Sequence, residues 1–387
     1  MHGYIDTISV PLHLPPSAFK PATASSTSNA KGKQKAHNQD QVTPSSTAAY
    51  DVVANWTPAD RLEVEKMVQM ASLLGYSTVV LDISIPPTFD PSLLSFPTPL
   101  FPSLDPRTAT PGTPNLALQL WRITIENYSD EAVKGAGQKG WYGFANSTAP
   151  LYPQQTTLLS VVPTTLASFS HVALSLSPPS AHAPTLISID PSLSPRLPFP
   201  LKRGLISTLS RFGVSFELVL RGLTRQDSGG GGGEGDSGKR RRNWISGARE
   251  IVRATQGKGV VISSGAKCAH EMRASQDLIN LCSLIGMPAN QAKDALTVNP
   301  QRSILRGLSM RSTYRGVFSN PTLTASDTTK ASVVQMDIEK ESPTTTMGGK
   351  KRSSGQPTTK ETTSESAKRP EQNGTEGSAG KGKKRKL

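Results

Sequence analysis

The sequence has few of the residues on which disulfide frameworks, metal sites and membrane spans depend. Only two cysteines, Cys268 and Cys282, occur in 387 residues, and they form no C-x-x-C pair. Neither a disulfide framework nor a cysteine-based zinc site is therefore indicated. No run reaches 18 apolar residues, which predicts a chain without a membrane span. The opening residues lack the basic start and long apolar run of a signal peptide, so we expect an intracellular chain.

Short apolar segments alternate with amphipathic helical segments along most of the chain. A helix is expected from Thr57, since an N-cap threonine, Pro58 and the acid Asp60 follow one another. Buried parallel strands with helical crossovers give this alternation, and no GxGxxG follows the first strand to favour a dinucleotide-binding sheet. We predict an α/β fold, a TIM-barrel-like (β/α) barrel of about seven strands, at residues 4–10, 77–85, 118–126, 157–163, 185–190, 214–220 and 259–263.

The composition predicts one barrel domain, built from residues 1–16 and 50–318. Four segments are expected to lack regular structure because they are low in complexity or rich in proline or glycine. They are an insertion at 17–49, a Pro-rich loop at 86–114, a Gly-rich loop at 226–239 and a basic tail at 319–387.

The residues needed for hydrolysis are scarce. The six histidines form no HxH or HExxH spacing, and no GxxxxGK[ST] or GxSxG occurs. Asp6, Asp82 and Asp190 lie on or near strand ends, but three carboxylates without histidines make a weak metal site. Asp6 and Asp82 are interpreted as hydrogen-bonded structural acids, and no metal or cofactor is predicted. A metal-dependent phosphoesterase on the same barrel is the alternative.

Positive charge is concentrated in one part of the chain. Residues 1–201 carry 11 Lys and Arg against 13 Asp and Glu, whereas residues 202–315 carry 19 against 8, and the rest 13 against 8. A polyanion is the simplest partner for such an asymmetry, and ordinary solvated basic surface is the alternative.

Six basic residues within this region are the predicted RNA contacts. Lys202 and Arg203 lie in the first turn of a predicted helix, where a cation is unfavourable because it opposes the helix dipole. This favours a functional role over a stabilising one for these two residues. In the sequence SSGAK, residues 263–267, a turn of small residues could offer backbone N–H groups and a lysine to a phosphate, or could be a simple turn with a solvated lysine. The predicted contacts are Lys202, Arg203, Arg242, Arg253, Lys267 and Arg273.

The tail ends in a basic cluster, Lys383, Lys384, Arg385 and Lys386. An exposed Lys/Arg cluster in a low-complexity tail predicts nuclear import, and nonspecific polyanion binding is the alternative.

Several segments resemble a known family. They are LISIDPSLSPRLPFPLKRGLISTLSRFGVSFELVL and RRNWISGAREIVRATQGKGVVISSGAK, and more weakly LLGYSTVVLDISI, LWRITI and YIDTISV. In this order they resemble the thirty-kilodalton protein subunit family of nuclear ribonuclease P and RNase MRP.

The resemblance implies a barrel similar to the polymerase-and-histidinol-phosphatase superfamily without a working metal site. It implies a non-catalytic scaffold of a ribonucleoprotein whose RNA is catalytic and which removes the 5′ leader of precursor tRNA and processes precursor rRNA. The implied partners are the catalytic RNA, precursor tRNA and other protein subunits, including a small α/β subunit. The implied location is the nucleus and nucleolus, with no membrane.

Overall fold

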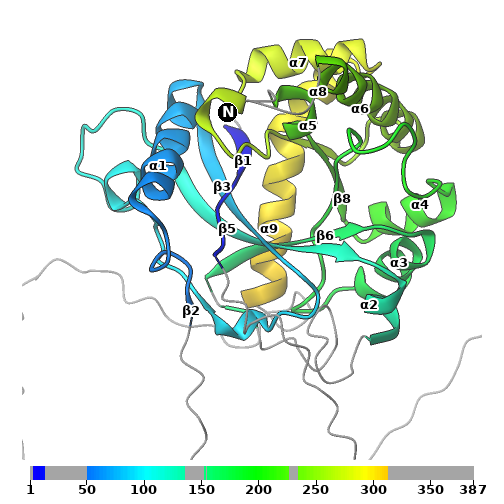
Figure 1. Ribbon diagram of the computed structural model, residues 1–387, viewed down its shortest axis with the longest axis horizontal. Coiled ribbons are helices and arrows are strands. Elements are labelled where there is room, and N and C mark those ends of the chain that lie inside the picture. The colour runs from blue at the N-terminus through cyan, green and yellow to red at the C-terminus, as the bar shows by residue number, and fades with distance from the viewer. Residues whose placement is uncertain (1–2, 14–49, 136–151, 154, 226–233, 313–387) are drawn as a thin grey trace, which may run out of the picture. The chain divides into compact units, whose positions relative to one another are not determined.

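Seven parallel strands form the centre of the computed structural model, in the order β1-β3-β5-β6-β7-β8-β9 (Figure 1). Each of them coincides with a strand expected from the sequence, so the prediction of a seven-stranded α/β barrel is confirmed. Their bounds are β1 Tyr4–Ser9, β3 Tyr76–Ile85, β5 Leu118–Tyr128, β6 Thr156–Pro163, β7 Leu186–Ile189, β8 Ser215–Val219 and β9 Val260–Ser263.

The structure describes residues 3–13, 50–135, 152–153, 155–225 and 234–312, all of which lie in one compact unit. The predicted insertion at 17–49, the tail at 319–387 and its basic cluster lie outside the described residues. Within the described part, no helix is both long enough and apolar enough to cross a membrane.

The sheet closes on itself where β1 meets the segment after β9. Ser9 N donates to Ala266 O at 2.8 Å, and Gly265 N donates to Thr7 O at 2.9 Å. Gly265 has a φ of +55°, and a Cβ there would lie 2.4 Å from a methyl carbon of Val219. Only glycine fits this closing turn, because it alone combines a left-handed backbone with such a close approach.

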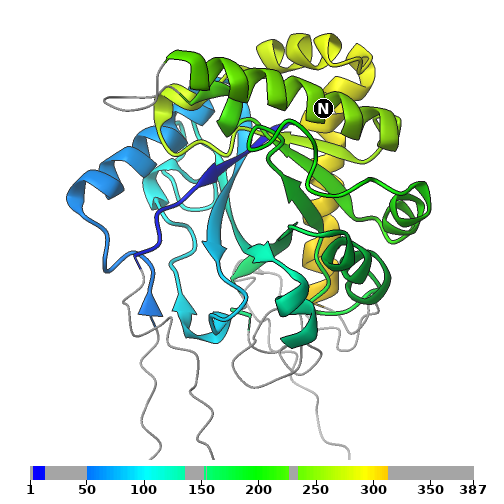
Figure 2. The same ribbon diagram turned by 45° about the vertical axis from the view of Figure 1, so that its right-hand side comes forward.

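Helices surround the barrel on its outside (Figure 2). The α1 helix begins as expected, with Thr57 and Asp60 forming a capping box. Trp244 is buried against the barrel and its indole donates to Val219 O at 2.8 Å. The helices are α1 Pro58–Leu73, α2 Asp130–Gly135, α3 Leu166–His171, α4 Arg203–Arg211, α5 Arg221–Thr224, α6 Glu234–Thr255, α7 Ser275–Leu284, α8 Ala289–Leu296 and α9 Val298–Ser312.

The α9 helix closes the amino-terminal end of the barrel and passes behind the strands in Figure 1. Asn299 Nδ2 donates to Val260 O at 2.7 Å, and Arg306 Nη1 donates to Pro184 O at 2.7 Å, so α9 crosses the starts of several strands. Its side chain Ile304 belongs to a small apolar cluster with inward-facing residues of five strands, Ile5, Val80, Leu158, Leu186 and Val261. This end of the barrel is therefore filled by apolar side chains.

The Pro-rich segment 86–114 is packed, and its interpretation as unstructured is wrong. It contains two short 3-10 turns and β4 (Leu94–Ser95), which pairs with β2 (Tyr50–Asp51). Phe96 and Phe101 are buried, and the Phe96 ring lies 4.6 Å from that of Trp121. The expected loop at 226–239 is also shorter, because α6 already includes residues from Glu234 onward. In both segments apolar packing or helix formation outweighs the local turn composition.

Candidate functional site

Three charged side chains meet in the middle of the barrel. Arg122 on β5 donates through Nε to Asp82 Oδ1 of β3 at 2.7 Å and through Nη1 to Glu217 Oε1 of β8 at 2.6 Å. Inward-facing positions recur every second residue along a strand, and this parity brings the three together. Thr124 donates to Asp82 and Ser188 donates to Glu217, which adds neutral hydrogen bonds to both carboxylates.

This arrangement uses the carboxylates for an ion pair. Burial alone would raise the pKa of the Glu217 carboxyl, but the charge of Arg122 and the hydrogen bonds from Arg122 and Ser188 reverse the shift and lower that pKa. A guanidinium fills the space between the two carboxylates. The residues do not fit a divalent metal here, because the guanidinium of Arg122 already neutralises the carboxylates of Asp82 and Glu217 that would have to bind the metal. The interpretation of Asp82 as a structural acid agrees with this geometry.

Asp6 is a buried carboxylate of a different kind. Its Oδ1 accepts from Ser264 N at 2.7 Å and from Thr7 N at 2.8 Å, while Oδ2 has no hydrogen-bond partner. Burial raises the pKa of Asp6 to about 6, although the two backbone N–H groups act in the opposite direction. Asp6 thus joins β1 to the end of β9, and its role is structural, as expected.

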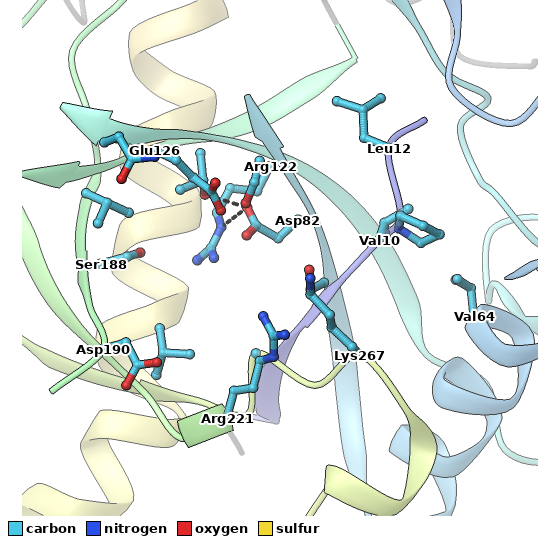
Figure 3. A pocket seen from close by; sticks show the side chains of 18 of the residues that line it. Val10, Leu12, Val64, Asp82, Arg122, Glu126, Ser188, Asp190, Arg221 and Lys267 are labelled. Carbon is cyan, nitrogen blue, oxygen red and sulfur yellow. Dashed lines mark hydrogen bonds and ion pairs between the residues drawn. The ribbon is translucent and has the colours of Figure 1, made fainter. Parts of the chain in front are cut away.

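A cavity of about 690 Å³ opens at the carboxyl ends of the strands, above the ion-pair layer (Figure 3). Ligand sites of (β/α) barrels lie at this end, and the volume is in the range of small-molecule sites. Arg221 and Lys267 extend into it, and neither forms an ion pair with another described residue. Glu126 and Asp190 also line it. Asp60 and Glu63 line it as well, so the two unpaired cations lie among four carboxylates besides the Asp82–Arg122 ion pair.

The two cations are close enough to affect each other. Burial lowers the pKa of the Lys267 ammonium, and the charges of Arg221 and Arg225 lower it further, while Glu126 partly compensates. The Nε atom of Arg221 is buried without a hydrogen-bond partner. Arg221 and Lys267 are the unpaired cations of the lining that could hold an anion, although acidic side chains outnumber basic ones around the cavity.

The turn before Lys267 does not offer its backbone to a ligand. Ser264 N is bonded to Asp6, Gly265 N to Thr7 O, Ala266 N to Ser264 Oγ and Lys267 N to Glu271 Oε2. The idea that SSGAK presents free N–H groups to a phosphate is therefore wrong, because closing the barrel uses them. Gly265 and Lys267 of this segment line the cavity, and Lys267 extends its side chain into it.

Two of the predicted contacts lie on the outer face of α6. Arg242 and Arg253 are exposed and, together with Arg249, line a shallow depression that also contains Glu250. Neither Arg242 nor Arg253 pairs with an acid among the described residues. The buried stripe of the same helix includes Trp244, so its basic face points away from the core.

The other predicted contacts are separate from both places. Lys202 is the N-cap of α4 and Arg203 its first residue, and both are exposed. Arg273 is half-buried, and its Nη1 donates to His270 O and Met272 O, both at 2.7 Å. The structure thus divides the six residues between the barrel mouth, the face of α6, the start of α4 and the turn before α7.

Sequence reasoning missed Arg122, Glu217 and Arg221. The first two are single charges within apolar strands, at positions whose parity places them with Asp82 inside the barrel. That parity was a usable signal, because a buried charge requires a partner of opposite sign. Arg221 begins α5, two residues after β8 ends at Val219, and gave no comparable signal.

One further group of side chains could hold a metal. Cys268, His270 and Glu271 place their ligand atoms within 4.8 Å of one another, in the loop after β9. Cys268 is half-buried, His270 exposed and Glu271 buried.

Comparisons with known proteins agree with this architecture. The model of the family "RNase P subunit p30" matches residues 48–312. A probable ribonuclease P protein subunit 3 of Schizosaccharomyces pombe is 28% identical over 134 residues, which cover 35% of this chain and 52% of that protein. Ribonuclease P protein subunit p30 of Mus musculus is 30% identical over 128 residues, covering 33% and 43%. This chain therefore matches about half of the length of these relatives, or less.

A solved structure is also similar. A chain in the cryo-EM structure of archaeal ribonuclease P with mature tRNA has a TM-score of 0.43 and 14% identity, covering 64% of this chain and 89% of that one. The family match runs from just before β2 to the end of α9 and includes the segments whose sequence resembled this family, except YIDTISV, which precedes it. The chain belongs to the RNase P subunit p30 family.

Proposed function

We propose that this chain is a non-catalytic, RNA-binding protein subunit of RNase P and RNase MRP. It supports removal of the 5′ leader from precursor tRNA and processing of precursor rRNA. The observation that carries the proposal is the family match over residues 48–312. The ion pairs of Arg122 with Asp82 and Glu217 support the absence of hydrolysis by the barrel itself, because they use the inward-facing carboxylates.

The proposed partners are the catalytic RNA, precursor tRNA and other protein subunits, among them a small α/β subunit. The net charge of +14 and the unpaired cations at the mouth and on α6 support RNA as the main ligand. Lys202, Arg203, Arg242, Arg253, Lys267 and Arg273 are the proposed contacts, to which the geometry adds Arg221. The proposed location is the nucleus and nucleolus, with Lys383, Lys384, Arg385 and Lys386 as the import signal.

Reconstitution tests whether the protein chain or the RNA component cleaves precursor tRNA. The purified chain is incubated with precursor tRNA and Mg²⁺ or Mn²⁺, alone and together with the RNA component and the remaining subunits. We expect leader cleavage only when the RNA component is present. Cleavage by the chain alone, abolished by chelation, would instead identify a metal-dependent phosphoesterase and overturn the proposal.

The salt dependence of RNA binding tests the contacts. In the double variant Arg253→Ala and Lys267→Ala we expect the slope of log K against log salt to decrease by about 0.7–0.9 for each phosphate contact that is lost. The matched control removes two exposed cations of α1, Arg61→Ala and Lys66→Ala, and should leave the slope unchanged. An unchanged slope in the first variant would show that these residues do not contact phosphate.

The tail can be tested separately. Deleting residues 319–387 should leave most RNA binding by the barrel intact, whereas replacing Lys383, Lys384, Arg385 and Lys386 with glutamine should exclude a fluorescent fusion from the nucleus. If the deletion abolishes RNA binding, the chain is a basic protein that binds through its tail. If the glutamine variant still accumulates in the nucleus, the cluster is not the import signal.

A further inference from the structure

Three side chains with different metal-binding atoms converge beside the barrel mouth. The thiol of Cys268, a ring nitrogen of His270 and a carboxylate oxygen of Glu271 lie within 4.8 Å of one another. In a tetrahedral zinc site, with bonds of about 2.0–2.3 Å, donor atoms are about 3.3–3.8 Å apart. The three side-chain ends therefore need to close by only about 1 Å around a zinc ion. Rotation about side-chain bonds is sufficient for such a movement.

The charges around the thiol favour a cation at this place. The Cys268 thiol lies within electrostatic range of the carboxylates of Glu271 and Glu63 and, with a weaker effect, of the cations Arg221 and Arg225. Neither carboxylate forms an ion pair with another described residue. A thiol and two carboxylates thus gather without a directly bonded cation, a charge distribution that a divalent ion would balance.

Backbone hydrogen bonds orient the acids. Lys267 N donates to Glu271 Oε2 at 2.8 Å, which holds the buried carboxylate and leaves Oε1 available. Ala269 N donates to Glu63 Oε1 at 2.9 Å and ties α1 to the same turn. Ligands that are held by such surrounding hydrogen bonds bind metal more tightly, because their side chains lose less conformational freedom when the metal binds.

We propose that Cys268, His270 and Glu271 form a zinc site with three protein ligands, which fixes the turn carrying Lys267 at the barrel mouth. Thiolate, imidazole and carboxylate together are a zinc donor set, whereas Mg²⁺ and Ca²⁺ prefer oxygen ligands alone. In a zinc site with three protein ligands, the fourth ligand is water. The compact C-x-H-E spacing differs from the paired spacings of zinc fingers, which is why the sequence alone did not indicate it.

Cobalt substitution of the full-length chain tests the site directly. Co²⁺ bound through a thiolate gives a sulfur-to-metal charge-transfer band, and tetrahedral coordination gives strong visible bands. We expect one Co²⁺ per chain with both signals, and displacement of Co²⁺ by Zn²⁺. The variant Cys268→Ser should lose the charge-transfer band, and His270→Gln should lower the affinity at least tenfold. Zn²⁺ should raise the Tm of the unaltered chain but not that of Cys268→Ser.

The second cysteine provides the matched control. Cys282 is buried in α7 and is not part of the cluster, so Cys282→Ser should retain the band, the stoichiometry and the increase in Tm. Circular dichroism and the metal-free Tm establish that each variant folds. A charge-transfer band that survives in Cys268→Ser would place the metal on the other thiol, Cys282, and Co²⁺ bound without this band in the unaltered chain would place it on nitrogen and oxygen ligands alone. Either result would overturn the proposal.

Discussion

Arginine has opposite surroundings inside the barrel and on α6. Arg122 is buried and bonded to Asp82 and Glu217, whereas Arg242 and Arg253 are exposed and lack an acidic partner among the described residues. Inside, carboxylates on β3 and β8 balance the charge of the arginine. On α6 it remains available to a ligand. The same residue type therefore indicates structure or binding according to whether its charge is balanced within the chain.

The buried acids differ in the same manner. Glu217 shares a guanidinium and has a lowered pKa, while Asp6 has only hydrogen-bond donors and a pKa raised to about 6. A full opposite charge compensates for burial in one case, and two backbone N–H groups fall short of it in the other. This comparison of balanced and unbalanced charges leads to three predictions, given from the largest effect to the smallest.

Removing the cation inside the barrel should have the largest effect. Arg122→Met leaves two buried carboxylates unpaired, so we expect the free energy of unfolding to decrease by about 3–5 kcal/mol. Urea denaturation followed by circular dichroism measures it. Adding Asp82→Asn and Glu217→Gln to the same chain should recover most of the loss, because no charge is then left buried. A single variant that loses less than about 1 kcal/mol would show that the ion pairs are not structural.

The unbalanced acid should make stability depend on pH. The pKa of Asp6 is higher in the folded chain, about 6, than its ordinary 3.8, so the folded state holds the proton more tightly. Its contribution is complete below pH 4 and is lost as the pH rises through about 6, which amounts to about 3 kcal/mol. Compared with Asp6→Asn, the unaltered chain should lose this amount between pH 4 and pH 7 in urea titrations. Parallel pH profiles of the two proteins would contradict the raised pKa.

The exposed arginines should matter least for stability. Replacing Arg242 and Arg253 with alanine should change the free energy of unfolding by no more than about 0.5 kcal/mol, since surface changes away from structural contacts are nearly neutral. The same variant should bind RNA more weakly and with a smaller salt slope. Thermal unfolding and filter binding on one preparation separate the two effects. A large loss of stability with unchanged RNA binding would reverse the assignment of this helix face.

The strands were predictable because period and apolar content are local properties of each segment. The contacts that join segments far apart in the chain were not predictable. Arg122 and Glu217 are 95 positions apart, and only the closed sheet brings them together. Two of the N–H groups of SSGAK were misjudged for the same reason, since their acceptors Asp6 and Thr7 lie near the start of the chain. The packing of the Pro-rich segment on Trp121 also depends on tertiary contacts.

The position of α9 also determines how far its C-terminal end lies from the barrel mouth. Arg311, one residue before the helix ends, donates to Tyr152 O and Pro153 O near the start of β6, at the end of the barrel away from Lys267. The eight residues of β6 correspond to about 20–25 Å of barrel height at about 3.3 Å per residue. A fluorophore attached at Ser312 therefore lies at the end of the barrel opposite the mouth. A linker from Ser312 needs at least about seven extended residues to reach the mouth.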